Sequence, residues 1–244
     1  MNFQGNESKA GFEDCVTIKQ TKLQGRFTVA NRDIEPGELL AVDQPFVKHL
    51  DKEHTKTHCW HCLANTQFLP IFACPNCSGV LFCSETCRTI ATETYHKFEC
   101  GFTDVLYQAD VGVWILAYRI VSSYQKDFFL QNLHVEDENF GDFCKLVAHY
   151  GSEKFTPPEL MKEALICVFL TRCLQATGYF GNLQSSESDF GFEELSVSMW
   201  IHKFMRISRF NCHAIREVKK VKCGFFPNLL GLTDRLNYSE LYKH

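Results

Sequence analysis

The sequence predicts an α+β fold whose β core is split along the chain. Residues 15–48 and the region from about residue 208 carry short apolar runs between turn residues, a pattern typical of strands. Between them, from about residue 103, apolar residues recur with the period of a helix. We therefore expect the two strand-forming segments to meet in one antiparallel core, with a cysteine-rich segment and several helices inserted between them.

The composition indicates a globular protein with a large, aromatic-rich core. The chain has 244 residues, of which 45% are hydrophobic and 22 are phenylalanines, and its net charge is −4. A slightly acidic chain does not attract nucleic acid or an anionic membrane surface. The sequence has no membrane-spanning apolar run and no secretory signal at its start. We expect an intracellular protein of the cytoplasm or nucleus, where disulfides are rare.

The elements on either side of the cysteine-rich segment can be placed in order. In residues 15–48, short strands are predicted around Val16, Phe27 and Leu39, and a charged linker follows over residues 49–58.

Helices are predicted within residues 101–207. The first begins near residue 103. The second is the best marked, because Thr156 can cap its N-terminus, Pro157 suits its first position and Glu159 lies in its first turn. A third covers residues 195–207.

Seven of the thirteen cysteines lie within residues 59–100, and one histidine joins them. The eight residues form pairs at ligand spacing, namely Cys59-x2-Cys62, Cys74-x2-Cys77, Cys83-x3-Cys87 and His96-x3-Cys100. Zinc takes four sulfur or nitrogen ligands in a tetrahedron, so these residues can bind two ions. A segment this small, with few apolar residues, usually needs a metal to fold. We therefore predict a two-zinc finger in preference to cysteines that merely fill a core.

The spacing alone leaves the pairing of the ligands open. Sequential pairing would place the first four cysteines on one ion. Three nearby histidines, His54, His58 and His61, have no partner at ligand spacing, so we expect them to be solvated or to support the ligands.

The order of these pairs, with Phe82 before Cys83, resembles a MYND finger. In that family the pairs interleave. The resemblance implies that one zinc is held by Cys59, Cys62, Cys83 and Cys87. It implies that the other is held by Cys74, Cys77, His96 and Cys100.

The flanking segments are similar to parts of a SET domain. Residues 25–46 resemble its opening, and residues 161–180 and 204–215 match later stretches in the family's order. Over about residues 15–232, the chain resembles the SET-and-MYND family of protein-lysine methyltransferases, in the branch whose longer members carry N-terminal helical repeats. The implied parts are an N-terminal SET segment (15–48), the MYND finger (59–100), a helical insert (101–207), a partial SET core (208–232) and a divergent tail (233–244).

The resemblance implies an S-adenosylmethionine-dependent protein-lysine methyltransferase. By motif, Gly25 and Arg26 would line the cofactor pocket, and Asn211 would hydrogen-bond the cofactor. From the residues alone, a turn glycine, a solvated arginine and a strand-end cap are equally good interpretations.

The C-terminal part departs from the family pattern. Residues 224–227 match a GLYP-like run, but the Asn-His-Ser-Cys segment, the tyrosine-bearing stretch and the post-SET zinc site are not found after Asn211. We therefore expect a SET core that is incomplete at its C-terminal end, assign no catalytic residue, and expect no useful lysine methylation by this chain. The alternative is a catalytically inactive member whose finger binds proline-containing peptides of protein partners.

Overall fold

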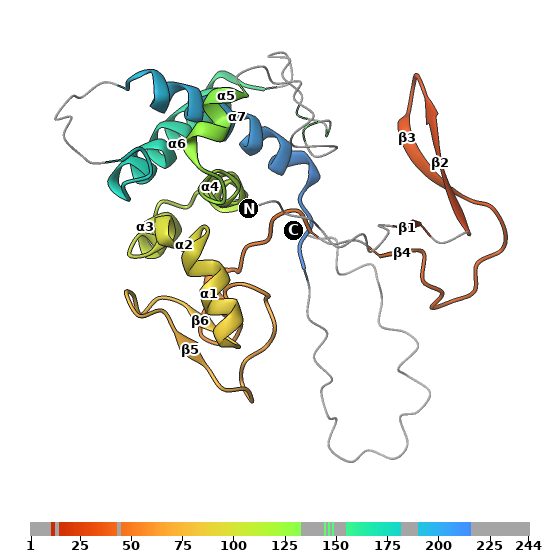
Figure 1. Cartoon of the computed structure of the whole chain (residues 1–244). Helices are drawn as coiled ribbons and strands as arrows, with labels where there is room; N and C mark the ends of the chain where they lie inside the picture. The colour runs from red at the N-terminus through yellow and green to blue at the C-terminus, as the bar shows by residue number, and fades with distance from the viewer. Residues whose placement is uncertain are drawn as a thin grey trace. The chain divides into compact units, whose positions relative to one another are not determined.

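The structure, a computed structural model, describes residues 11–12, 15–42, 45–132, 155–181 and 190–215, with residues 144, 146 and 148. Its antiparallel sheets pair β1 (Gly11–Phe12) with β4 (Ala41–Val42), β2 (Val16–Thr21) with β3 (Gly25–Ala30), and β5 (Phe72–Ala73) with β6 (Leu81–Phe82) (Figure 1). The predicted mixture of strands and helices is therefore present. Within the described part of the chain each sheet has two strands, and most of the expected partner region, from residue 216 onward, lies outside it. The joined β core stays a prediction.

The β2–β3 hairpin is the longest strand pair described. Its loop ends at Gly25, which pairs with Thr21 and has φ +69°, a left-handed conformation that favours glycine. Large apolar side chains of the hairpin, Ile18 and Leu23, are exposed. A two-stranded ribbon is only marginally stable by itself. The hairpin therefore presents apolar side chains that a larger sheet would cover.

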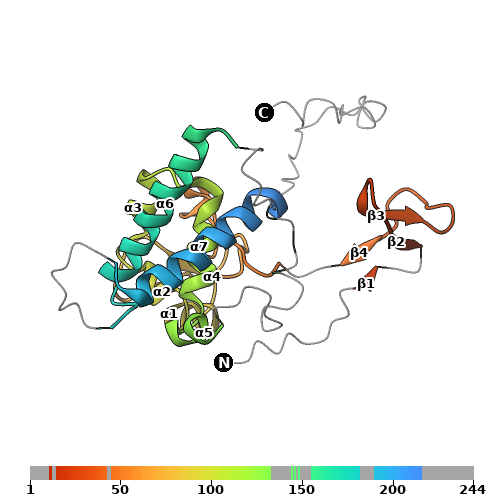
Figure 2. The same ribbon diagram turned by 90° about the horizontal axis from the view of Figure 1, so that it is seen from above.

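The helical part of the chain is built around an aromatic-rich core. Its main helices are α4 (Ile115–Ser122), α5 (Lys126–Gln131), α6 (Pro157–Ala176) and α7 (Phe192–Asn211). The last of these packs against the other three (Figures 1 and 2). At its centre, the rings of Trp200 and Phe204 lie 5.7 Å and 6.4 Å from that of Phe129. No helix among the described residues combines the length and apolarity that crossing a membrane requires.

The helix predicted from residue 103 is broken into three pieces, so that prediction was wrong in its continuity. The pieces are α3 (Thr103–Gln108), the short 3-10 helix η2 (Gly112–Trp114) and α4. Asp110, between α3 and η2, and Gly112, the first residue of η2, have φ values of +49° and +57°, which an α-helix cannot contain. The apolar period continues across this turn, and therefore it did not reveal the break.

The third predicted helix extends beyond residues 195–207 at both ends. It begins earlier, with Glu193 and Glu194 in a first turn where the helix dipole favours acidic side chains. Residues 208–211, which we expected to begin a strand, form its last turn. Ser208 is 4% exposed, so helical packing continues past the expected end.

The second predicted helix is confirmed as α6. It begins at Pro157, and the carboxylate of Glu159 accepts hydrogen bonds from the backbone N–H and the hydroxyl of Thr156, each at 2.9 Å. These two bonds fasten the first turn to the residue before it. Hydrogen bonds from Thr156, with a further one from Arg209, hold the pKa of Glu159 down, to about 2. The capping carboxylate is therefore ionised throughout the physiological pH range.

Replacing Thr156 with alanine should destabilise the protein through this first turn. We expect Thr156→Ala to lower the free energy of unfolding by about 1 kcal/mol, the usual cost of losing an N-cap. Denaturant unfolding followed by circular dichroism measures the change. Thr89 is exposed in the finger helix α1 (Glu85–Glu93), and Thr89→Ala, as the control, should change the value by less than about 0.5 kcal/mol. Equal effects of the two substitutions would contradict the assigned cap.

Candidate metal centre

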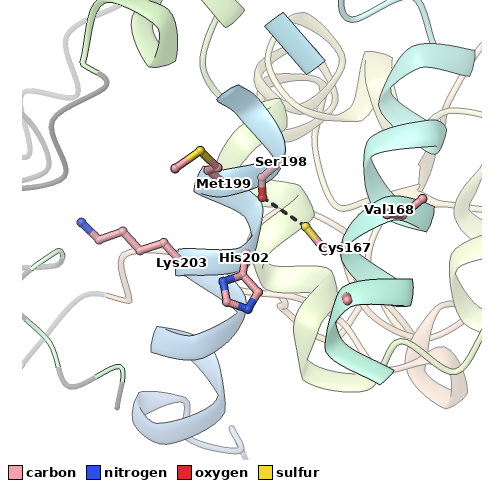
Figure 3. A pocket seen from close by; sticks show the side chains of 7 residues that line it. Cys167, Val168, Ser198, Met199, His202 and Lys203 are labelled. Atoms are coloured by element: carbon pink, nitrogen blue, oxygen red, sulfur yellow. Dashed lines mark hydrogen bonds between the residues drawn. The ribbon is translucent and has the colours of Figure 1, made fainter. Parts of the chain in front are cut away.

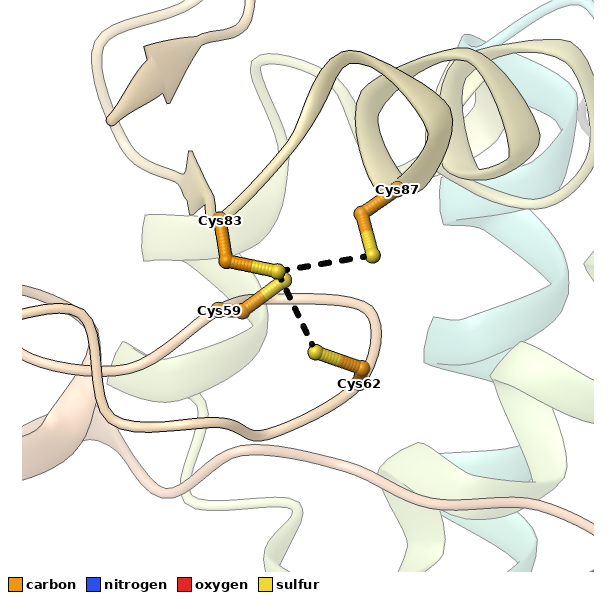
Figure 4. Close-up of side chains that lie close together, drawn as sticks. All are labelled: Cys59, Cys62, Cys83 and Cys87. Atoms are coloured by element: carbon orange, nitrogen blue, oxygen red, sulfur yellow. Dashed lines mark hydrogen bonds between the residues drawn. The ribbon is translucent and has the colours of Figure 1, made fainter. Parts of the chain in front are cut away.

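The first ligand cluster joins two distant parts of the chain. Cys59 and Cys62 lie on a turn, while Cys83 follows β6 and Cys87 lies in the first turn of α1. Figure 4 shows their side chains converging. Sγ of Cys62 and Sγ of Cys83 are 3.4 Å apart, and Sγ of Cys83 and Sγ of Cys87 are 3.6 Å apart. A tetrahedral zinc with Zn–S bonds of about 2.3 Å sets its sulfurs about 3.8 Å apart, so the cluster fits the ion.

The second cluster has the same construction. Cys74 and Cys77 come from the turn after β5, and His96 and Cys100 come from α2 (His96–Glu99) and its C-terminal cap. Sγ of Cys74 lies 3.8 Å from Sγ of Cys100, and Sγ of Cys77 lies 3.5 Å from Nε2 of His96. In each cluster the four donor atoms lie within 4.8 Å of one another. The pairs thus converge in the interleaved order, and sequential pairing is wrong.

Local backbone geometry explains why the ligands point inward. In the first turn, Leu63 has φ +68° and its N–H bonds to the carbonyl of Cys59 at 3.0 Å, which folds Cys62 back toward Cys59. At the start of α1, Ser84 caps the helix by accepting from the N–H of Cys87 at 3.1 Å. Both features place two sulfurs on the same side of a tight turn.

The electrostatics of the clusters favour a bound cation. Burial, together with the neighbouring thiols, raises the pKa of Cys83 and that of Cys100 to about 12. Burial would also raise the pKa of Cys74, but hydrogen bonds from Asn76 and His96 outweigh it and lower the value to about 7. Thiolates so close together repel one another, and a divalent ion removes that repulsion while keeping every cysteine ligand ionised.

Sequence reasoning left one buried acidic residue beside the second cluster unassigned. Glu99 precedes the ligand Cys100 and is 1% exposed. Its carboxylate accepts from Nε and Nη2 of Arg119 at 2.7 Å and 2.8 Å, and from Nε1 of Trp60 at 3.0 Å. Burial alone would raise the pKa of Glu99, but the charge of Arg119 outweighs it and lowers the value to about 2. A charged residue next to a ligand was the only signal in the sequence.

The three other histidines of the segment lie outside both clusters. The ring of His54 lies 5.1 Å from that of His58, whose Nδ1 is 2.8 Å from the hydroxyl of Thr57. Nδ1 of His61 is 3.1 Å from the hydroxyl of Tyr95. These histidines therefore contact neighbouring side chains of the finger.

The candidate cofactor residues lie on separate elements. Gly25 and Arg26 open β3, where Gly25 completes a turn and Arg26 is exposed. Asn211 is the last residue of α7 and is half-buried, with Nδ2 donating to the carbonyl of Ile207 at 2.7 Å. Asn211 therefore ends a helix and not a strand.

A shallow apolar pocket lies between α6 and α7 (Figure 3). Its volume is about 420 Å³, and it is lined by Ala164, Cys167, Val168, Ser198, Met199, His202 and Lys203. Sγ of Cys167 donates to the carbonyl of Ser198 at 3.1 Å, and burial raises the pKa of this thiol to about 11. A protonated, hydrogen-bonded thiol is a poor nucleophile, so the pocket does not resemble a cysteine active site.

Comparison with known proteins identifies the cysteine-rich segment. A family model for the MYND finger matches residues 59–100, which contain both clusters. The class of protein that the site defines is therefore a zinc-binding MYND-finger protein.

Relatives extend the match beyond the finger. The chain is 32% identical over 119 residues to Protein-lysine N-methyltransferase SMYD4 of Homo sapiens, covering 41% of this chain and 15% of the relative. It is 28% identical over 94 residues to a SET and MYND domain-containing protein of Dictyostelium discoideum, covering 36% of the chain and 22% of the relative. SET domain-containing protein 3 of Caenorhabditis elegans is 24% identical over 268 aligned positions, covering 100% of the chain and 49% of the relative.

Over the finger and part of the chain beyond it, the chain is similar to proteins of the SET-and-MYND family. The matched stretch spans only 15–16% of the length of the SMYD4 proteins.

The clusters predict two zinc ions per chain. Purified under reducing conditions, the protein should contain two zincs by elemental analysis, and one ion or none would contradict the site. Cys74→Ser should unfold the finger, because structural zinc contributes on the order of 10 kcal/mol to folding in small fingers. Cys167→Ser is the matched control. Its thiol lies in the helical part, so the zinc content should stay at two.

Proposed function

We propose that this chain acts through its finger as a zinc-dependent protein-interaction module, with proline-containing peptides as ligands. The observation that carries this proposal is an exposed apolar loop between the first two ligand pairs. Phe68 is 96% exposed, and Leu69 and Ile71 are also exposed. Contiguous apolar side chains on a surface otherwise rich in polar groups are typical of protein-binding sites.

The loop is held in place by the finger. The N–H of Thr66 bonds to the carbonyl of Thr57 at 2.8 Å, and the N–H of Leu69 bonds to the carbonyl of Thr66 at 3.1 Å. Thr66 itself is buried. A proline-rich peptide forms an extended helix without internal hydrogen bonds, and it docks on aromatic side chains held in a fixed position. The ring of Phe68 is suited to this contact.

Removing the Phe68 ring should weaken peptide binding. We expect Phe68→Ser to lower the affinity for proline-containing peptides at least about thirtyfold, since a buried aromatic anchor is worth about 2 kcal/mol or more in an interface. Fluorescence anisotropy with a peptide library measures the effect. Leu23 is equally exposed but lies on the β2–β3 hairpin, so Leu23→Ser should leave the affinity unchanged. Identical affinities for wild type and Phe68→Ser would count against the loop as the binding surface.

A second proposal, supported by the names of the relatives, is protein-lysine methylation by the whole protein. S-adenosylmethionine would supply the methyl group. The residues of this chain that would bind and orient it are Gly25, Arg26 and Asn211. The pocket between α6 and α7 contains none of them, so that pocket is not the proposed cofactor site.

Cofactor binding tests these three positions. If they line a cofactor pocket, S-adenosylmethionine should raise the melting temperature of the protein, and Asn211→Ala should reduce the shift. Each lost polar contact typically weakens binding by roughly 1 kcal/mol, about fivefold in affinity. Asn132, which donates to the carbonyl of Phe128 on α5, provides the control Asn132→Ala. A shift that survives in Asn211→Ala would refute the role given to Asn211.

A further inference from the structure

One arginine outside the finger touches residues adjacent to both ligand clusters. Arg119 lies on α4, beyond the segment matched by the finger model, and is 3% exposed. Its guanidinium centre lies 4.8 Å from the ring of Trp60 and 4.6 Å from the ring of Tyr95. Trp60 follows the ligand Cys59 in the sequence, while Glu99, which accepts two bonds from Arg119, precedes Cys100. The arginine thus lies at a junction between the two clusters.

Each nitrogen of this guanidinium is used. Nε and Nη2 bond to the carboxylate of Glu99, and Nη1 donates to the carbonyl of Lys48 at 2.8 Å. Close by, the hydroxyl of Tyr107 donates to the carbonyl of Leu50 at 2.6 Å. The segment before the finger, the finger and α4 are therefore joined through one side chain.

The carboxylate held by Arg119 faces the histidine of the second cluster. Oε2 of Glu99 lies 3.9 Å from Nδ1 of His96, while Nε2 of the same ring faces Cys77. His96 is 1% exposed, and no hydrogen-bond partner is described for its Nδ1. At 3.9 Å this is an electrostatic contact, longer than a hydrogen bond, and a carboxylate behind a ligating imidazole favours one ring orientation and strengthens the ring as a ligand. Glu99 is placed to do this for His96 alone, because the first cluster contains no histidine.

We propose that Arg119 is a positioning residue for the second zinc site. By holding Glu99 behind His96, it makes the zinc affinity of this cluster depend on the packing of α4 and of residues 48–50. The cluster consists of Cys74, Cys77, His96 and Cys100. The working unit of this finger therefore extends beyond residues 59–100 into the helical part of the chain. The coupling is reciprocal, so zinc in the second site also stabilises α4.

The alternative is that Arg119 only neutralises a buried carboxylate. A second buried pair in the same chain provides the control. Nε of Arg206 lies 2.6 Å from the carboxylate of Glu163, and its guanidinium lies 4.0 Å from the ring of Phe155. Arg206 is 4% exposed and lies on α7, away from the ligands in the sequence. Removing either arginine takes a cation from a buried acid, although Glu163 keeps Arg209 at 2.8 Å, and only Arg119 positions a carboxylate beside a ligand.

The test compares zinc retention at the two sites in the full chain. Arg119→Met, Arg206→Met and wild type are equilibrated with a graded zinc chelator, and the released cysteines are alkylated and identified by mass spectrometry. For Arg119→Met we expect Cys74, Cys77 and Cys100 to be labelled at a chelator concentration about 10–100-fold lower than in the wild type. This is the usual loss of metal affinity when an outer partner of a ligand is removed. Labelling of Cys59, Cys62, Cys83 and Cys87 should change much less. Arg206→Met should match wild type at both sites.

Unchanged labelling in Arg119→Met, or equal changes at both clusters, would overturn the proposal. If Arg119→Met does not fold, Arg119→Lys is used, because lysine keeps the charge but cannot bond both carboxylate oxygens at once. Hydrogen exchange then gives a second readout. Removing zinc from the wild type should speed exchange in residues 115–122, and this response should be smaller in Arg119→Lys. No response of these amides to zinc in the wild type would also overturn the proposal.

Discussion

The interleaving of two ligand sets is the constraint on which the first half of the chain depends. The first cluster takes its pairs from before and after the β5–β6 hairpin, and the second takes its pairs from the loop of the hairpin and from α2, so neither can close unless the intervening chain folds back on itself. The elements that do so are short, with two residues in each strand and four in α2. Their buried apolar core is correspondingly small. Metal coordination supplies the stability that such a core lacks.

The helical part is stabilised in a different way, by burial of aromatic and aliphatic side chains between α7 and its neighbours. The two parts meet at α4. There the hydroxyl of Tyr118 donates to the carbonyl of Phe98 at 2.5 Å. Arg119 binds the carboxylate of Glu99, which is the next residue of the finger. Removing one partner of a buried arginine–carboxylate pair strongly destabilises a fold. This contact therefore makes the finger and the helices mutually dependent.

Sequence alone predicted the ligands and the best-marked helix, because both are encoded locally. Ligand spacing identified the eight residues that form the two clusters, and Thr156 with Glu159 marked the start of α6. Interleaving is set by long-range folding, so it followed from the family resemblance and not from the spacing. The turn at Asp110 was hidden because apolar residues continue through it. Glu99 and Arg119 are twenty positions apart and look like ordinary charges until the fold buries them together.

The pairing of the ligands is tested most directly by cadmium–proton correlation NMR on protein in which cadmium replaces zinc. Each cadmium couples only to the side-chain protons of its own ligands. The structure predicts that one ion couples to Cys59, Cys62, Cys83 and Cys87, and that the other couples to Cys74, Cys77, His96 and Cys100. A spectrum in which Cys59 and Cys74 couple to the same ion would contradict the interleaved finger.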